Sequence, residues 1–156
     1  MRSDSVPTLP NRAAVWDLSQ APTDSWPLIS HLELRAIPAS VPSARKHARA
    51  VTQEWELSAL VDDVELVVSE LVTNAVNAAL KRLHVASANS DPVRLWIGSD
   101  LESVLVQVWD SSPEMPVRRQ PGPSDERGRG LILAEHICRV WGTYRKGHGK
   151  VVWLVL

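Results

Sequence analysis

The sequence is poor in the residues that support metal and redox chemistry. Cys138 is the only cysteine among 156 residues, so the chain forms no internal disulfide and no thiolate cluster for zinc or an iron–sulfur centre. The net charge is −1, without the basic excess that nonspecific binding to nucleic acid or anionic lipid requires. The fold must therefore rest on side-chain packing, and we expect no direct nucleic-acid partner.

Long apolar runs are also absent. Residues 1–7 carry no signal-peptide pattern, and no stretch approaches the roughly 18 apolar residues that span a membrane. Phenylalanine is missing, and the seven tryptophans are scattered along the chain, as packing residues usually are. Apolar residues make up 44% of the chain and charged residues 22%, as in ordinary globular proteins. We therefore expect a cytoplasmic protein with no membrane partner and one folded domain.

Hydrophobic periodicity predicts alternating strands and helices after a flexible N-terminal arm over residues 1–27, which contains Pro7, Pro10 and Pro22 among small and polar residues and has no regular period. The patterns that follow predict a strand over 31–37, a helix from Ser40 or Ser43 to Trp55, a long helix with Ser58 as its N-cap that reaches Leu83, a hairpin of 92–97 and 102–109 with its turn at 98–101, a loop over 111–127, a helix over 131–139, and a closing hairpin of 140–145 and 150–156. Residues 28–156 are therefore predicted to form an α+β two-layer sandwich, with a mixed β-sheet, or an antiparallel one, and helices on one face.

The long predicted helix has an apolar side and a polar stripe. At 100° per residue, the residues predicted to face the core are Leu60, Val61, Val64, Val68, Leu71, Val72, Ala75, Ala78 and Ala79. The opposite side carries Asp63, Glu70, Thr73, Asn74 and Asn77. Threonine and asparagine are poorer helix formers than the Lys and Glu pairs of an ordinary solvated face. The stripe is therefore either a tolerated polar surface or a site in which Glu70 acts as a base and Asn74 offers an amide oxygen to a hard cation.

Two further features each allow a functional and an ordinary interpretation. Asp110 ends the second strand of the first hairpin and precedes Ser-Ser-Pro, which suits a turn or the recognition of an exocyclic amine such as that of adenine. Gly128-Arg129-Gly130 opens a predicted helix. Backbone amides and the helix dipole favour phosphate at such a place, but many helices begin beside glycines for local reasons.

Four motifs occur in an order that is typical of one superfamily. They are Glu70-Leu71-Val72-Thr73-Asn74-Ala75, Val108-Trp109-Asp110, Gly128-Arg129-Gly130-Leu131 and Gly149-Lys150-Val151-Val152-Trp153. Over residues 30–156 the chain resembles the GHKL ATP-binding superfamily of gyrase, histidine kinases and mismatch-repair ATPases. Its small size is most similar to the branch of anti-sigma-factor serine/threonine kinases. The resemblance implies a Bergerat-type ATP-binding fold with ATP and Mg²⁺ as cofactors.

The resemblance also implies roles for individual residues. Glu70 corresponds to the general base, Asn74 to the ligand of the Mg²⁺ ion that bridges the phosphates, and Asp110 to the residue that binds the adenine amine. The other residues that it places at the nucleotide are Asn77, Arg127, Gly128, Arg129, Gly130 and Leu131. Either Arg127 or Arg129 would contact the γ-phosphate. The chain departs from the superfamily pattern at Ser112 and Glu114, which replace two glycines of the second motif.

These implications lead to two functional hypotheses. The first is a regulator that binds Mg·ATP, phosphorylates a Ser or Thr of an antagonist protein, and controls transcription through a sigma factor. Its partners are then a sigma factor, an anti-sigma antagonist or both, and assembly as a homodimer stays open. The alternative is a non-catalytic module that binds a partner and has a retained or degenerate ATP site. ATP hydrolysis coupled to a change of shape is less favoured, because we see no transducer domain after the nucleotide module.

Overall fold

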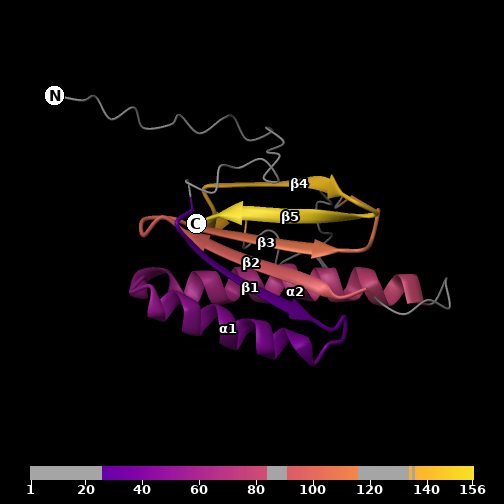
Figure 1. Cartoon of the computed structure of the whole chain (residues 1–156), viewed down its shortest axis with the longest axis horizontal. Coiled ribbons are helices and arrows are strands. Elements are labelled where there is room, and N and C mark those ends of the chain that lie inside the picture. The colour runs from indigo at the N-terminus through magenta and orange to yellow at the C-terminus, as the bar shows by residue number, and fades with distance from the viewer. Residues whose placement is uncertain (1–25, 84–90, 116–133, 135) are drawn as a thin grey trace.

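The computed structural model describes residues 26–83, 91–115, 134 and 136–156 (Figure 1). Its elements are β1 (Leu28–Leu34), α1 (Ser40–Glu54), a 3-10 turn η2 (Ser58–Leu60), α2 (Val61–Leu83), β2 (Val93–Ser99), β3 (Val104–Asp110), β4 (Val140–Lys146) and β5 (Gly149–Val155). The strands form one sheet in the order β1-β2-β3-β5-β4. The predicted N-terminal arm, apart from its last two residues, and residues 131–133 and 135 of the predicted helix 131–139 lie outside the described residues; 134, 136 and 137 of that helix are helical.

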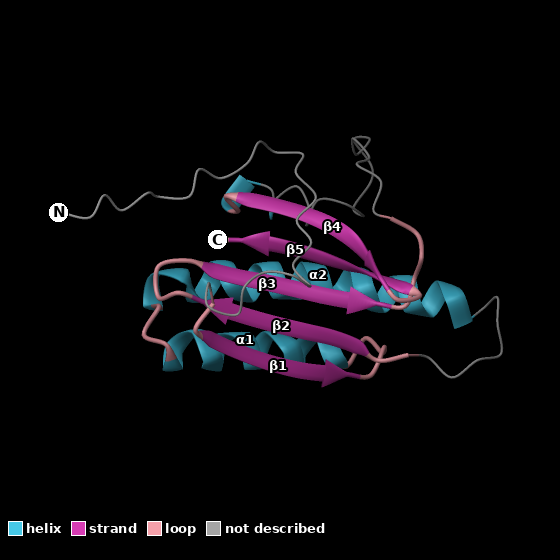
Figure 2. Cartoon of the chain, turned by 45° about the horizontal axis from the view of Figure 1, so that its top comes forward, coloured by secondary structure: helices cyan, strands magenta, loops and turns pink. Residues whose placement is uncertain are grey.

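Helices and sheet form two layers, with α1 and α2 on one face of the sheet (Figure 2). The α+β sandwich is therefore confirmed. All four neighbouring strand pairs are antiparallel, so the mixed sheet is wrong and the antiparallel alternative holds. The reason is that two helices, α1 and α2, follow β1 in the sequence before β2 begins. They run up and down, so the chain returns to the sheet in the direction opposite to β1. Hairpins join β2 to β3 and β4 to β5, and a hairpin makes its two strands antiparallel.

The main core lies between the helices and every second residue of the strands. Val93, Leu95 and Ile97 of β2 are fully buried, and α2 packs against both β3 and α1. The buried residues of α2 are Val61, Val64, Val67, Val68, Leu71, Val72, Ala75, Val76 and Ala79. The predicted core side of α2 is thus largely correct, but Leu60 and Ala78 are only half-buried. Val67 and Val76 were not predicted to be buried; a helix covered from two sides buries a wider stripe than one lying on a sheet alone.

The first strand begins earlier than predicted. β1 spans Leu28–Leu34 rather than 31–37, and its register with β2 pairs Leu28 with Ser99 and Leu34 with Val93. The chain turns directly after Leu34, because the N–H of Ile37 donates to the carbonyl of Arg35 at 2.8 Å. The alternation of polar and apolar residues continues across this turn, which explains why periodicity alone misplaces the strand.

Two other boundaries also differ from the prediction. Ser58 does not cap a helix, because residues 58–60 form the 3-10 turn and no side-chain hydrogen bond caps it. The turn between β2 and β3 lies later than 98–101, since Ser99 is still paired with Val104. Asp100 directs this turn, and its Oδ1 accepts hydrogen bonds from the N–H of Glu102 at 3.0 Å and of Ser103 at 2.6 Å. An aspartate that bonds to the backbone two or three residues ahead is ordinary turn chemistry.

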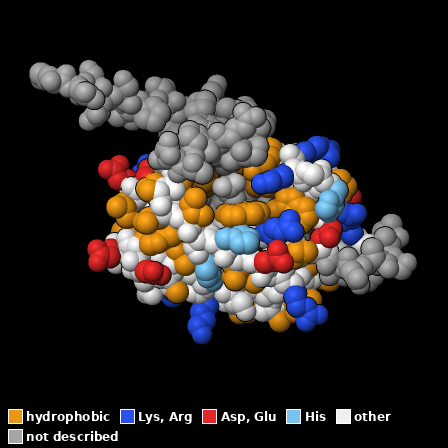
Figure 3. Space-filling model, viewed as in Figure 1, with side chains coloured by type: hydrophobic (Ala, Val, Ile, Leu, Met, Phe, Trp, Pro, Cys, Tyr) orange, Lys and Arg blue, Asp and Glu red, His pale blue; other side chains and the backbone are white. Residues whose placement is uncertain are grey.

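The opposite face of the sheet carries a second apolar cluster. Its buried members are Leu105, Trp109, Val140, Tyr144, Val151 and Trp153, with Trp26, Trp96 and Val155 partly buried beside them. Figure 3, drawn in the same orientation as Figure 1, shows hydrophobic side chains interspersed with charged and histidine side chains on the face toward the viewer. Four of the tryptophans therefore pack in this cluster. Of the helices in the described part of the chain, none combines the length and apolarity that a membrane span requires.

Candidate functional site

Asp110 lies at the end of β3, on the face of the sheet that the helices cover. Alternate residues of a strand point to the same face, and Val104, Val106 and Val108 of β3 belong to the main core. Asp110 continues this row and is only 3% exposed. Its Oδ1 accepts a hydrogen bond from the N–H of Ser112 at 2.8 Å, which is the turn chemistry expected of Asp-Ser-Ser. A buried carboxylate therefore closes an apolar row.

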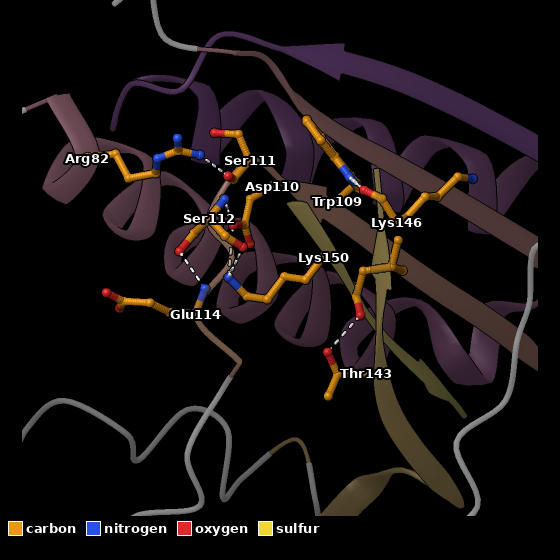
Figure 4. A network of polar contacts seen from close by, with 10 residues as sticks. Arg82, Trp109, Asp110, Ser111, Ser112, Glu114, Thr143, Lys146 and Lys150 are labelled. Atoms are coloured by element: carbon orange, nitrogen blue, oxygen red, sulfur yellow. Dashed lines mark hydrogen bonds and ion pairs between the residues drawn. The ribbon is translucent and has the colours of Figure 1, made fainter. Parts of the chain in front are cut away.

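Lys150 of β5 lies directly opposite Asp110 in the register of the two strands. Its Nζ is 2.9 Å from Oδ1 of Asp110 and 3.4 Å from the carbonyl oxygen of Ser112 (Figure 4). The side chains of Lys150 and Asp110 are 7% and 3% exposed. Lys150 is not among the residues predicted for the site, although a single lysine within a run of buried strand residues is the signal that could have identified it.

Burial and charge act on Asp110 in opposite directions. Burial raises the pKa of the Asp110 carboxyl, and this effect is the largest. The ammonium of Lys150, then the N–H of Ser112 and the guanidinium of Arg82, counteract it. The net direction is upward from the ordinary value of an aspartate. Lys150 is thus the strongest single group that stabilises the ionised form of Asp110.

Arg82 connects α2 to the segment that follows β3. Its Nη1 donates a hydrogen bond to the carbonyl oxygen of Ser111. In the same segment the N–H of Glu114 donates to Oγ of Ser112 at 3.3 Å. Ser112 and Glu114 are the two positions that depart from the superfamily's glycines, and here they form a small turn beside Asp110. Arg82 is a second residue that the sequence did not single out; its position in the last turn of the predicted helix was the available signal.

The polar stripe of α2 lies on the side of the helix that the core leaves uncovered. Glu70 is half-buried, whereas Asn74 and Asn77 are exposed. At 1.5 Å per residue, Asn77 and Asn74 precede Arg82 along the helix axis by about 7.5 and about 12 Å. Since Arg82 contacts the segment after Asp110, the C-terminal end of α2 lies beside this end of β3, and Asn77 is the residue of the stripe that is nearest to it along the helix axis. Arg127, Gly128, Arg129, Gly130 and Leu131 lie outside the described residues, so the predicted phosphate loop stays a prediction.

The donor and acceptor groups at this end of the sheet fit a nucleotide. Oδ2 of Asp110 accepts no hydrogen bond within the described part of the chain, whereas Oδ1 accepts two. An unpaired acceptor therefore remains for a donor such as an exocyclic amine. Glu70, Asn74 and Asn77 likewise form none of the hydrogen bonds or ion pairs found among the described residues, so their oxygens are available to a ligand. Carboxylate and amide oxygens suit Mg²⁺.

An α+β sandwich with a buried carboxylate at the end of a central strand and a polar side on the covering helix is the arrangement that the resemblance to ATP-binding proteins implies. Residues 34–156 match the family described as "Histidine kinase-like ATPase domain". The chain belongs to this family and contains a GHKL-type ATPase domain, and this membership implies that it binds ATP. No curated protein matches the chain.

Gly149 allows β5 to approach Asp110 closely. A Cβ added at Gly149 would lie 2.0 Å from the carbonyl oxygen of Asp110 and 2.8 Å from Cζ2 of Trp109. Because backbone cannot move aside as a flexible side chain can, we expect Gly149→Ala to lower the free energy of unfolding by about 3 kcal/mol or more. Urea denaturation of the variant measures this effect.

Gly147 provides the matched control for this prediction. It has φ +61° and open space around its Cα, so Gly147→Ala costs only the strain of a left-handed alanine, about 1–2 kcal/mol. If Gly149→Ala were no more destabilising than Gly147→Ala, β3 and β5 would not approach each other as closely as the structure has them.

Proposed function

We propose that the protein is a cytoplasmic serine/threonine kinase of the anti-sigma type. It binds Mg·ATP, transfers the γ-phosphoryl group to a Ser or Thr hydroxyl of an antagonist protein, and thereby controls a sigma factor. The support is the family membership of residues 34–156, together with the resemblance of the four motifs to this branch. The observation that carries the proposal is that Glu70 and Asn74 lie one helical turn apart on the side of α2 that the core leaves uncovered, in a helix whose last turn contacts the segment after the buried Asp110.

Each residue has one chemical task in this proposal. Asp110 accepts a hydrogen bond from the adenine amine through Oδ2, and Asn74 offers its amide oxygen to Mg²⁺. Asn77 adds a polar group one turn further along α2 and contacts the nucleotide. Arg127 or Arg129 contacts the γ-phosphate, and Gly128, Gly130 and Leu131 supply backbone amides to the phosphates. When bound, Mg²⁺ neutralises charge that develops on the phosphates.

Glu70 performs the proton transfer. Its carboxylate accepts the proton of the attacking Ser or Thr hydroxyl while the oxygen of that hydroxyl forms the new bond to phosphorus. The bond from phosphorus to the leaving oxygen breaks, and ADP keeps that electron pair. A carboxylate that makes no internal hydrogen bond or ion pair in the described part of the chain is suited to this task, because no intramolecular partner has to be released first.

Glu70→Gln separates binding from transfer. The amide keeps the shape of the side chain but cannot accept the proton, so we expect the ATP affinity to stay within about twofold while phosphoryl transfer falls by about 10²–10⁴-fold. Calorimetry with ATP and Mg²⁺ measures binding. Transfer of labelled γ-phosphate to candidate antagonist proteins encoded by neighbouring genes measures the reaction.

Glu65→Gln is the matched control on the same helix. Glu65 pairs with Arg49 at 2.5 Å and with Arg45 at 3.2 Å, so its substitution removes exposed ion pairs worth at most about 1 kcal/mol. Transfer should persist in this variant. Unchanged transfer by Glu70→Gln would remove Glu70 from the role of base, and a wild-type protein that binds no ATP at millimolar concentration would refute the proposal as a whole.

A non-catalytic partner-binding module is the second candidate, and one observation favours it. The Asp110 carboxylate already has a cationic partner inside the fold, at 2.9 Å, and Ser112 and Glu114 replace glycines beside it. Binding of ATP without transfer to any antagonist, combined with capture of a sigma factor or an antagonist in the presence of ATP, would favour this module. A second copy of the chain as partner is tested by sedimentation with and without ATP.

A further inference from the structure

The ion pair between Asp110 and Lys150 has no task in the proposed function so far. It ends an apolar row of the two strands, in which the next residues are Val108 and Val152. On the other side of β5, Arg145 of β4 lies opposite Lys150 in the register. A buried ion pair is weak evidence for stability, because desolvation of two charges offsets much of their attraction. A lysine at this place therefore calls for a role other than stabilising the fold.

The geometry of the pair restrains the carboxylate. Nζ of Lys150 at 2.9 Å and the N–H of Ser112 at 2.8 Å both donate to Oδ1 (Figure 4). Two donors on one oxygen fix the rotation of the carboxylate and leave Oδ2 as the acceptor for an incoming group. Nζ also lies 3.4 Å from the carbonyl oxygen of Ser112, so the lysine is itself held by the turn that follows β3.

The positive charge of Lys150 keeps the Asp110 carboxylate a strong hydrogen-bond acceptor. Burial raises the pKa of Asp110, while Lys150 from β5 and, more weakly, Arg82 from α2 are the charged side chains that oppose this effect. Without Lys150 the balance moves further towards the neutral carboxyl. Hydrogen bonds to an ionised acceptor are about twice as strong as those to a neutral one.

We propose that Lys150 is a positioning residue for base selection, which holds Asp110 ionised and oriented so that Oδ2 accepts the exocyclic amine of the base. This inference rests on the proposed function, in which Asp110 contacts adenine. Lys150 itself touches neither the base nor the phosphates. We therefore expect Lys150 to affect how much the exocyclic amine adds to the affinity for the nucleotide, and how that contribution depends on pH. We expect no effect on the recognition of the triphosphate.

Comparing the affinities for ATP and for purine riboside triphosphate isolates the contribution of the exocyclic amine to binding. The two nucleotides differ only by the exocyclic amine, so protonation of the triphosphate cancels in the ratio of their affinities. In the wild type we expect a ratio of about tenfold or more in favour of ATP, constant between pH 8 and pH 6. In Lys150→Met the ratio should fall by about tenfold at pH 6, and it should fall as the pH is lowered, because protonation of Asp110 removes the charged acceptor.

Two further variants complete the experiment. Lys150→Gln keeps a hydrogen-bond donor for Oδ1 but removes the charge, so the variant should fold. Its affinity ratio should depend on pH as that of Lys150→Met does. Lys146→Met removes a lysine whose Nζ lies 5.4 Å from the centre of the Trp96 ring, away from Asp110, and the ratio should stay as in the wild type. A wild type that binds neither nucleotide would overturn both the proposed function and this inference. A wild type that prefers ATP, with the same ratio and pH profile in Lys150→Met and Lys150→Gln, would overturn the inference alone.

Discussion

Asp110→Asn is expected to weaken ATP binding by a factor of roughly 30 to several thousand, because losing the charged partner of a buried hydrogen bond costs about 2–5 kcal/mol. The direction of the amide makes the substitution severe. The N–H of Ser112 and the ammonium of Lys150 both donate to Oδ1, so they hold the amide oxygen of the asparagine at that place. The NH₂ group then occupies the position of Oδ2 and presents a donor to the amine of adenine.

Calorimetric titration with ATP and Mg²⁺ measures this loss. Asp100→Asn is the matched control, because Asp100 also accepts backbone hydrogen bonds at the end of a strand but lies at the opposite end of β3. The control should bind ATP as the wild type does. An unchanged affinity in Asp110→Asn would show that Asp110 does not contact the base, and both the role of Asp110 and that of Lys150 would have to be abandoned.

Ile97→Ala is expected to have a large effect on stability. Ile97 is fully buried on β2, within the core that α2 covers, and the loss of its outer methyl groups leaves a cavity that the packed helices cannot fill. Such substitutions cost about 2–5 kcal/mol, which is a large part of the roughly 5–15 kcal/mol that stabilises a domain. Urea denaturation, monitored by circular dichroism, measures the difference in the free energy of unfolding between the variant and the wild type.

Ile29 offers a control with the same side chain on the neighbouring strand. It lies on β1, opposite Gly98, and is 57% exposed. Ile29→Ala should therefore lower the free energy of unfolding by less than about 1 kcal/mol, mostly through the lower strand propensity of alanine. Equal losses in the two variants would contradict the two-layer packing, since only one of the two side chains contacts the helices.

The elements of this fold follow from local patterns, and most were predictable for that reason. The 3.6-residue period over 61–83 and the two-residue period of the hairpins depend only on neighbours a few positions apart. Errors occurred where a local pattern runs past the real boundary, as at β1, or where a serine resembles a cap but begins a 3-10 turn, as at Ser58. The direction of the sheet stayed open because periodicity is the same in parallel and antiparallel strands.

Some residues of the candidate site were likewise predictable from local patterns, whereas others were not. Glu70, Asn74 and Asn77 share one side of α2, which helical spacing alone predicts, and the structure places them there. The position of Asp110 at the end of β3 was equally predictable from the hairpin. Arg82 was not, because its contact with Ser111 joins residues 29 positions apart, and nothing in a local pattern specifies such a pair.

The sequence by itself determined that this chain forms an α+β domain with a polar helix face, and that its motifs resemble those of the GHKL superfamily. Only the tertiary structure decided that Lys150 is the partner of Asp110. The two residues are 40 positions apart, and they meet because β5 lies between β3 and β4 in a register that puts them opposite each other. Strand order and register depend on the packing of the whole sheet, whereas helix and strand periods depend on adjacent residues.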